Sequence, residues 1–262
     1  MVVPGFVTVR TSSSRLPDKC LLPFGENSNV LQHIVRRASW FGIRPIVCTS
    51  EEASDDVIED IAQSEGVTCF RGANDNKVKR WLDAADSLGL RAFHTVDADD
   101  PFFDADDMKR SYAMLLDDDL LVVKPSERSS RGAATVGYSM RTAALETMLS
   151  DLRTEQDTEM VEPLIARIPK ERVAVLPDNP VFSLEPYRLT LDYEEDYAVL
   201  IALLQKVGAV APRSAVEQAI SDAPGLMAMN SSRAGEWASR QAELSSAITD
   251  EILGEEANDR RL

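Results

Sequence analysis

Short aliphatic and β-branched runs alternate with segments whose apolar residues recur at helical spacing along most of the chain. The clearest strand-like runs are residues 45–49, 67–70 and 92–96, and each is followed by a helical pattern. Such alternation is typical of βαβ units, in which helical crossovers connect the strands of a mostly parallel sheet. We therefore expect an α/β fold with a mostly parallel mixed sheet flanked by helices.

The C-terminal segment departs from this alternation. We place residues 1–225 in the α/β domain and residues 226–262 in a helical extension. The apolar residues of the extension that recur at helical spacing are Trp237, Leu244, Ile248 and Ile252. A helix of this length is marginal alone in water, so we expect it to pack on its own domain or on a second subunit. The charged tail after Gly254 is expected to be disordered.

The acidic composition narrows the range of partners. The chain has 44 acidic and 28 basic residues, and its net charge of −16 disfavours nucleic acid and anionic membranes. We find no apolar run long enough to span a bilayer and no signal-peptide pattern. The three cysteines lack metal-ligand spacing, so we expect reduced thiols in a cytoplasmic protein.

A polar loop rich in cations follows the strand-like residues 7–9. Such a loop can hold an anion at the end of a sheet, because N–H groups and hydroxyls surround phosphates while Arg and Lys neutralise them. The residues of this loop that we expect to hold a phosphate-bearing anion are Arg10, Thr11, Ser12, Ser13, Ser14, Arg15 and Lys19. The loop is not a Walker A motif, because it lacks the glycines of that pattern. A solvated basic loop is the simpler alternative.

A second cluster, Asp97-Ala98-Asp99-Asp100-Pro101, directly follows a predicted strand. Ligands of open α/β sheets bind beyond the carboxyl ends of the strands. Carboxylates gathered there are costly without a cation, and Mg²⁺ accepts one or two of them together with phosphate and water. We therefore expect a magnesium site in this cluster, with an ordinary acidic loop as the alternative in so acidic a chain.

Residues 10–19 resemble the Arg-x-x-Ser-x-Arg-Leu-Pro-x-Lys signature of the sugar cytidylyltransferases. That family makes CMP-activated ulosonic and nonulosonic acids and includes spore-coat-polysaccharide relatives. Asp99 resembles the metal-binding aspartate of the family's Gly-Asp-x-Pro element, with Ala98 in place of the glycine. Residues 188–196 resemble the Arg-Leu-Thr-x-Asp-x-x-Glu-Asp element that closes the family's domain, which implies Asp192 as a second metal ligand. The resemblance spans about residues 5–207.

A weaker match lies at residues 70–72, which resemble the family's Phe-Arg-Gly element. The family follows this element with an arginine on the next helix, and Arg80 occupies that place. The match adds Arg71, Asn74 and Arg80 to the residues expected to bind the nucleotide.

The acceptor side departs from the family pattern. Residues 159–165 resemble the family's Glu-His-Val-Thr-Pro-Tyr-Ile segment, but Met160 and Glu162 replace the histidine and the threonine. This difference puts the family's usual acceptor in doubt. The cations expected to bind the acceptor are Arg128, Arg131 and Arg188. An alternative role for Arg188 is to support Asp192.

The resemblance implies a single Rossmann-like nucleotidyltransferase domain that transfers CMP from CTP to an acidic sugar and releases pyrophosphate. Lys19, Arg10 and Arg15 are then the catalytic residues, because their charge stabilises the departing pyrophosphate. Mg²⁺ is the expected cofactor, CTP and an anionic small molecule are the expected partners, and a homodimer is the expected assembly.

Three other functions remain open. Related cytidylyltransferases activate phosphonates, so a phosphonate is an alternative acceptor. Asp97-Ala98-Asp99 also matches the Asp-x-Asp metal motif of nucleotide-sugar-dependent glycosyltransferases, which do not need the loop of residues 10–19. A non-enzymatic nucleotide-binding protein is the third, and the presence of Lys19 and both aspartates disfavours it. Pyrophosphate release distinguishes cytidylyl transfer from glycosyl transfer.

Overall fold

The computed structural model describes residues 2–13, 15–117, 119–126, 136–150, 152, 157–178 and 187–259, with the backbone alone at 247, 248 and 250–259. The strands are β1 (Val3–Thr8), β2 (Ile43–Ser50), β3 (Thr68–Gly72), β4 (Ala92–Asp97), β5 (Val122–Lys124), β6 (Ser139–Arg141) and β7 (Val173–Val175). The α-helices are α1 (Val30–Trp40), α2 (Asp56–Ser64), α3 (Lys77–Ser87), α4 (Ala105–Asp117), α5 (Thr142–Leu149), α6 (Glu162–Ile165), α7 (Glu194–Val207), α8 (Arg213–Asp222), α9 (Pro224–Ala228) and α10 (Arg233–Asp259). Short 3₁₀ turns are η1 (Lys19–Leu21), η2 (Ala53–Asp55) and η4 (Lys170–Arg172).

The described strands form one seven-stranded sheet in the order β3-β2-β1-β4-β6-β5-β7. β1 pairs in parallel with both β2 and β4, and β2 with β3, while β6 is antiparallel to β4 and to β5. This arrangement confirms the expected mostly parallel mixed sheet. In the register of β1 and β4, Thr8 lies opposite Asp97, so the segments that leave these two strands emerge side by side.

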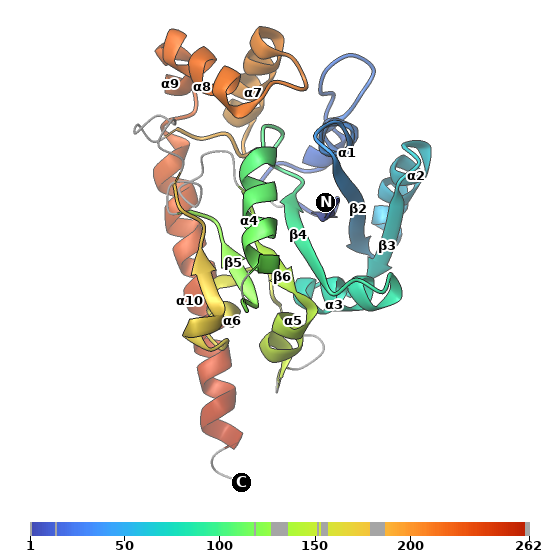
Figure 1. Cartoon of the computed structure of the whole chain (residues 1–262). Coiled ribbons are helices and arrows are strands. Elements are labelled where there is room, and N and C mark those ends of the chain that lie inside the picture. The colour runs from blue at the N-terminus through green and yellow to red at the C-terminus, as the bar shows by residue number, and fades with distance from the viewer. Residues whose placement is uncertain are drawn as a thin grey trace.

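Helices cover both faces of the sheet (Figure 1). Alternation along β1 supplies both cores, with Val3 and Val7 in one cluster and Phe6 in the other. The first cluster includes residues of α1, α2, α4, α7 and α8, and the second includes residues of α3, α5 and α6. The expected layers of helix, sheet and helix are therefore confirmed.

α1 begins after a tight turn in which Asn27 has φ of 51°. The N-cap residue is Asn29, whose side chain accepts a hydrogen bond from the backbone N–H of Gln32. An N-cap residue needs extended backbone, and the left-handed conformation of Asn27 excludes it from that role.

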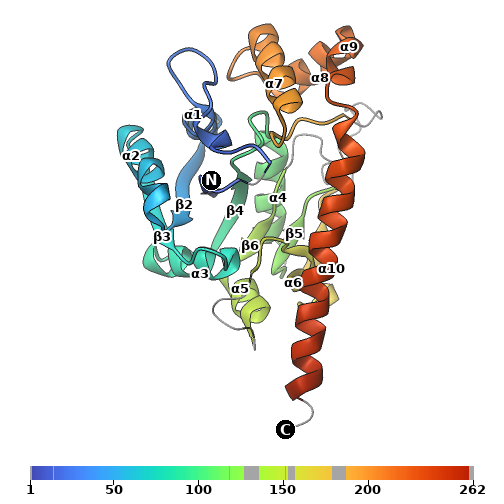
Figure 2. The same ribbon diagram turned by 180° about the vertical axis from the view of Figure 1, so that it is seen from behind.

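α10 folds back over its own domain and runs along the edge of the molecule beside α6 (Figures 1 and 2). The sequence suggested that this helix ends at Gly254, whereas it continues to Asp259. A glycine within a helix costs only about 1 kcal/mol relative to alanine, so it does not by itself end one. Within the described part of the chain, no helix combines the length and apolar character needed to cross a bilayer.

Candidate active site

Three segments that are distant in the sequence meet at the carboxyl ends of β1 and β4. The loop after β1 ends at Lys19, the first residue of η1. The turn after β4 carries Asp99. The segment before α7 joins this turn because the N–H of Leu191 donates to the carbonyl oxygen of Asp99 at 2.7 Å. The parallel pairing of β1 with β4 therefore positions the first two segments, and one backbone hydrogen bond attaches the third.

Lys19 lies between two carboxylates. Its Nζ is 2.8 Å from Oδ2 of Asp99 and 3.0 Å from Oδ1 of Asp192, and it also donates to the carbonyl oxygen of Leu191 at 2.9 Å. Burial alone would lower the pKa of Lys19, but Asp99 and Asp192 outweigh it and hold the pKa above its ordinary value. Both carboxylates therefore lie around one cation.

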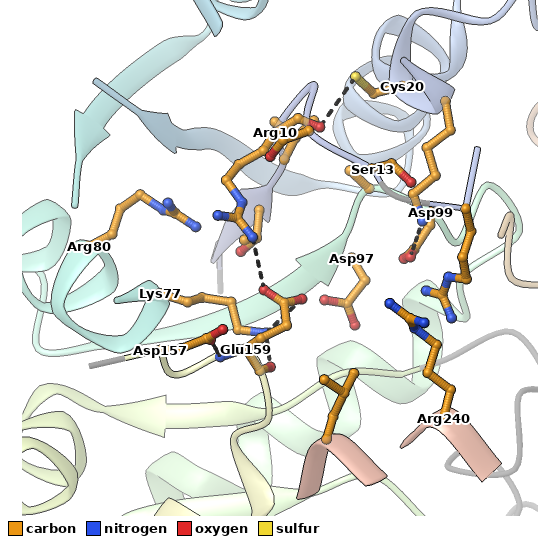
Figure 3. A pocket seen from close by; sticks show the side chains of 17 residues that line it. Arg10, Ser13, Cys20, Lys77, Arg80, Asp97, Asp99, Asp157, Glu159 and Arg240 are labelled. Atoms are coloured by element: carbon orange, nitrogen blue, oxygen red, sulfur yellow. Dashed lines mark hydrogen bonds and ion pairs between the residues drawn. The ribbon is translucent and has the colours of Figure 1, made fainter. Parts of the chain in front are cut away.

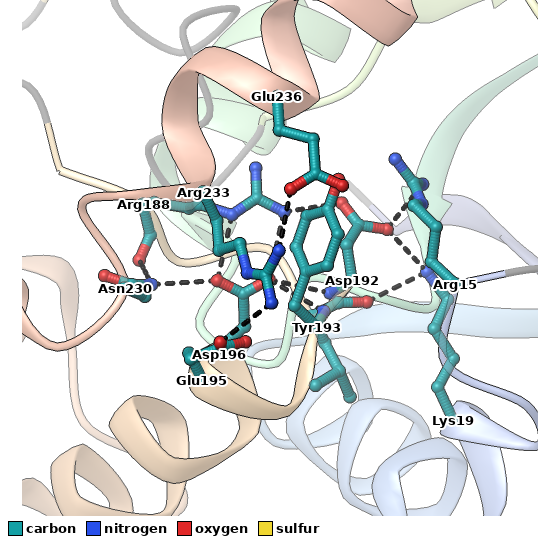
Figure 4. Close-up of polar contacts among 11 residues, drawn as sticks. Arg15, Lys19, Arg188, Asp192, Tyr193, Glu195, Asp196, Asn230, Arg233 and Glu236 are labelled. Carbon is teal, nitrogen blue, oxygen red and sulfur yellow. Dashed lines mark hydrogen bonds and ion pairs between the residues drawn. The ribbon is translucent and has the colours of Figure 1, made fainter.

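Asp192 is held by two further cations (Figure 4). Arg15 donates to its Oδ1 at 2.6 Å and Arg188 to its Oδ2 at 2.7 Å. Burial by itself would raise the pKa of Asp192, but Lys19, Arg15 and Arg188 lower it below the ordinary value. Because this side chain is only 1% exposed, its position is tightly determined.

Arg188 and Asp196 support Asp192 from behind. Arg188 also donates to Asp196 through Nε at 2.9 Å, and Asp196 accepts from the backbone N–H groups of Asp192 and Tyr193 at 3.0 Å. Asp196 thus caps the N-terminus of α7 from the first turn of the helix. The structure shows the supporting role for Arg188 that the sequence left as an alternative to acceptor binding.

The loop between β3 and α3 is attached to the loop after β1 by Arg10. Arg10 donates to the carbonyl oxygen of Asn74 at 2.9 Å and forms an ion pair with Glu159 at 3.4 Å. Arg80 is buried and donates to the carbonyl oxygens of Ala73 and Asn74 at 2.7 and 3.1 Å. Arg10 therefore joins the two loops, and Arg80 fixes the loop between β3 and α3 from its own helix.

A polar cavity of about 300 Å³ opens where these segments meet (Figure 3). Its charged lining residues are Arg10, Arg15, Lys19, Lys77, Arg80, Arg240, Asp97, Asp99, Asp157 and Glu159. Ser12 and Ser13 contribute hydroxyl groups to the same wall. The concentration of arginine and lysine gives this cavity a basic side in a chain of net charge −16, which suits a polyanionic ligand.

Several of the expected nucleotide-binding residues lie apart from this cavity. Thr11 gives both its N–H and its hydroxyl to Asp55, at 2.9 and 2.7 Å. Arg71 forms ion pairs with Asp56 and Glu59 of α2, at 2.6 and 2.9 Å. Neither is among the described residues that line the cavity. Ser14, Arg128 and Arg131 lie outside the described residues.

A model of the cytidylyltransferase family matches residues 5–207, which include all the segments that meet at the cavity except α10. The chain belongs to the cytidylyltransferase family. It is accordingly a nucleotidyltransferase.

Relatives of this cytidylyltransferase agree with that assignment. The chain is 27% identical over 218 residues to the spore coat polysaccharide biosynthesis protein SpsF of Bacillus subtilis, covering 77% of this chain and 86% of the relative. A solved cytidylyltransferase of Leptospira borgpetersenii has the same fold, with a TM-score of 0.76 and 24% identity over 86% of this chain and 96% of the other. A CMP:2-keto-3-deoxy-manno-octonic acid synthetase solved with CTP superposes with a TM-score of 0.55 and 16% identity, covering 78% and 98%.

The aspartates of this cytidylyltransferase have the donor chemistry that a magnesium site requires. Burial and the neighbouring Asp99 raise the pKa of Asp97 to about 6. Burial, together with the nearby charges of Asp99 and Asp97, raises the pKa of Asp100 above its ordinary value. Such crowding of carboxylates is relieved by a cation. No group of three or more Asp, Glu, His or Cys side chains arranged for a metal occurs in the described residues. Mg²⁺ nevertheless usually takes only one or two carboxylates as protein ligands and completes its coordination with phosphate and water oxygens.

Our sequence interpretation missed Lys77, Arg240 and Asp157 as cavity residues. Lys77 opens α3 and donates to the carbonyl oxygen of Glu159 at 2.6 Å, a contact between residues 82 positions apart that no local pattern indicates. Arg240 had a detectable signal, because it stands three residues after Trp237 and four before Leu244 on one helix face. We interpreted that stripe as packing only.

Proposed function

We propose that this cytidylyltransferase transfers CMP from CTP to an acidic small molecule of the ulosonic or nonulosonic acid type and releases pyrophosphate. The observation that carries the proposal is the position of Lys19 between Asp99 and Asp192 at the basic cavity. The structural neighbour solved with CTP, a synthetase for a keto-deoxy sugar acid, supports the choice of nucleotide and acceptor class.

The side chains after β1 have the functions that such a transfer needs. Ser12 and Ser13 line the cavity and offer hydroxyls to phosphate oxygens. Arg10, Arg15 and Lys19 supply positive charge that stabilises pyrophosphate as it leaves, and they are already held in place by Asn74, Asp192 and Asp99. Catalysis is therefore mainly positioning and charge neutralisation.

Mg²⁺ is part of the proposal, with Asp99 and Asp192 as its protein ligands. When bound there, the ion would neutralise phosphate charge and polarise the α-phosphoryl group. Arg15 and Arg188 keep the Asp192 carboxylate ionised and fixed, which is the state that a hard cation requires.

A phosphonate is the second candidate acceptor, because Met160 and Glu162 replace family residues beside the aspartates. Both line the cavity that contains Asp99 and Asp192. The Asp-x-Asp glycosyltransferase alternative loses support, since the family match covers the loop after β1 as well as the aspartates.

The test is a pyrophosphate-release screen of CTP, ATP, GTP and UTP against ulosonic acids, sugar phosphates and phosphonates. We expect release with CTP and one acidic acceptor, and loss of release when EDTA removes the divalent metal, with recovery on adding Mg²⁺. Turnover that persists in EDTA would refute the metal requirement. Absence of pyrophosphate release with all four nucleotides would refute the proposed transfer.

A homodimer belongs to the proposal as well. Closed two-fold dimers are the commonest oligomers. The first half of α10 contacts α6 of its own domain, so the interface could lie on the body of the domain or include this helix. Light scattering at micromolar concentration is expected to give about twice 28.9 kDa. A monomeric mass would exclude the dimer, and a dimer that survives deletion of residues 226–262 would exclude only the extension from the interface.

We also propose the cytoplasm as the site of the reaction. Cys20, Cys48 and Cys69 are free thiols, which suits a reducing compartment. Burial raises the pKa of the Cys20 thiol to about 12, so this cysteine stays protonated beside the cavity and takes no nucleophilic part.

A further inference from the structure

α10 lies beyond residues 5–207, the part of the chain that matches the family, yet it forms one wall of the basic cavity. Arg240 and Leu244 of this helix line the cavity together with the loop after β1 and the turn after β4. Leu244 also lines the neighbouring cavity that contains Asp99 and Asp192. The extension therefore faces the place where the phosphates of CTP are expected to bind.

Two contacts fix the start of α10 on residues that support the second aspartate of the site (Figure 4). Asn230, in the turn before the helix, donates to Asp196 at 2.9 Å. Trp237, on the helix itself, covers the guanidinium of Arg188 at 5.3 Å. Residues three apart on a helix lie on the same face, so Arg240 follows Trp237 along the face that is held to the site.

The Arg240 side chain is directed at the phosphate side of the cavity. Figure 3 shows it pointing from α10 into the cavity, whereas Arg10 points in from the loop after β1. A ligand between these two walls would have cations on both sides. This arrangement suits a chain of phosphates, which carries charge along its whole length.

The other cations that line the cavity are engaged by groups of the domain itself. In the described part of residues 5–207, each donates to a carboxylate or to a carbonyl oxygen, and these cations are Arg10, Arg15, Lys19, Lys77 and Arg80. The carboxylates that line the same cavity are Asp97, Asp99, Asp157 and Glu159. The lining charges of the family region are therefore nearly balanced, and Arg240 makes the cavity more attractive to a polyanion.

We propose that Arg240 is a further catalytic residue, which binds the phosphates that leave as pyrophosphate. The proposal rests on the proposed cytidylyl transfer. When the bond between the α-phosphorus and the bridging oxygen breaks, its electron pair stays on pyrophosphate, while the acceptor oxygen forms the new bond and its proton goes to water. A planar guanidinium stabilises the charge that develops on pyrophosphate, because it donates two parallel N–H bonds to phosphate oxygens. The C-terminal extension is thereby part of the active site.

Arg240→Ala and Arg240→Lys test this role, with Arg44→Ala as the matched control for the loss of one positive charge. Arg44 is exposed at the start of β2, at the end of the sheet opposite the cavity. We expect Arg240→Ala to lower the kcat of pyrophosphate release about 10–100-fold, because the remaining cations still neutralise part of the charge. Arg240→Lys should lose less, since an ammonium keeps the charge but not the fork of donors. Arg44→Ala should behave as wild type.

Isothermal titration calorimetry with pyrophosphate and Mg²⁺ measures the same contact without turnover. Arg240→Ala is expected to bind pyrophosphate at least about fivefold more weakly than wild type and Arg44→Ala, with an unchanged unfolding temperature, because alanine favours the helix and the arginine is exposed. Unchanged pyrophosphate affinity in Arg240→Ala overturns the proposal, as does an unchanged kcat. Failure of the proposed function has a different signature. Wild type would then release no pyrophosphate with any nucleotide, and the calorimetric comparison alone would decide whether Arg240 binds phosphate.

Discussion

Lys19→Ala is expected to lower kcat by about 10²–10³-fold while the KM for CTP changes little, because the lysine acts mainly when pyrophosphate departs. The ammonium is held 2.8 Å from Asp99 and 3.0 Å from Asp192, so its position is set before the substrate binds. The fold should survive the substitution, since Asp192 keeps Arg15 and Arg188 as partners.

Steady-state kinetics of pyrophosphate release and a thermal unfolding curve together measure this effect. Lys79→Ala is the matched control, because Lys79 pairs with Asp83 within α3 and is not among the residues that line the basic cavity. We expect near wild-type kinetics for the control. A Lys19→Ala enzyme with near-normal kcat would remove this residue from the mechanism.

Asp99→Asn and Asp192→Asn are expected to remove most of the metal-dependent activity, because an amide keeps the shape of the side chain but loses the charge that Mg²⁺ requires. The two variants should differ in stability. Asp99 is 28% exposed and pairs with Lys19, so its loss costs little. Asp192 is 1% exposed and faces three cations, so neutralising it leaves buried charge uncompensated and costs about 3 kcal/mol.

Activity measured across Mg²⁺ concentrations and urea unfolding separate these two effects. Asp60→Asn, at an exposed position of α2, serves as the control for the removal of one negative charge. Full activity of either Asp99→Asn or Asp192→Asn at low Mg²⁺ would contradict the shared site. Equal stability of the two variants would contradict the structural role assigned to Asp192.

Local patterns in the sequence predict the sheet, and they predict that the loop after β1 lies beside the aspartates of the turn after β4. Helices between successive strands favour parallel pairing, and the loop after β1 and the turn after β4 then share one end of the sheet. Asp192 is different, because no periodicity or spacing relates it to Asp99. Only the resemblance of residues 188–196 to a family element placed it on the same site.

Other features depended on packing that the sequence does not encode locally. The apolar pattern of residues 155–168 is helical, yet residues 157–168 contain only the short helix α6. The apolar stripe of α10 indicated that something covers this helix, but not that Arg240 and Trp237 face the cavities. Likewise, Arg71 matched a family element, yet the acidic residues of the neighbouring α2 engage it.

The most direct test of the account is ³¹P NMR of a reaction that contains CTP, Mg²⁺ and the acceptor found in the screen. The account predicts that the α-phosphorus appears in a new diester with the acceptor and that the β- and γ-phosphorus appear as pyrophosphate. It also predicts that neither signal forms with Lys19→Ala on the same timescale. Transfer of the γ-phosphoryl group, with CDP as the second product, would contradict the assignment of Lys19, Asp99 and Asp192 to nucleotidyl transfer.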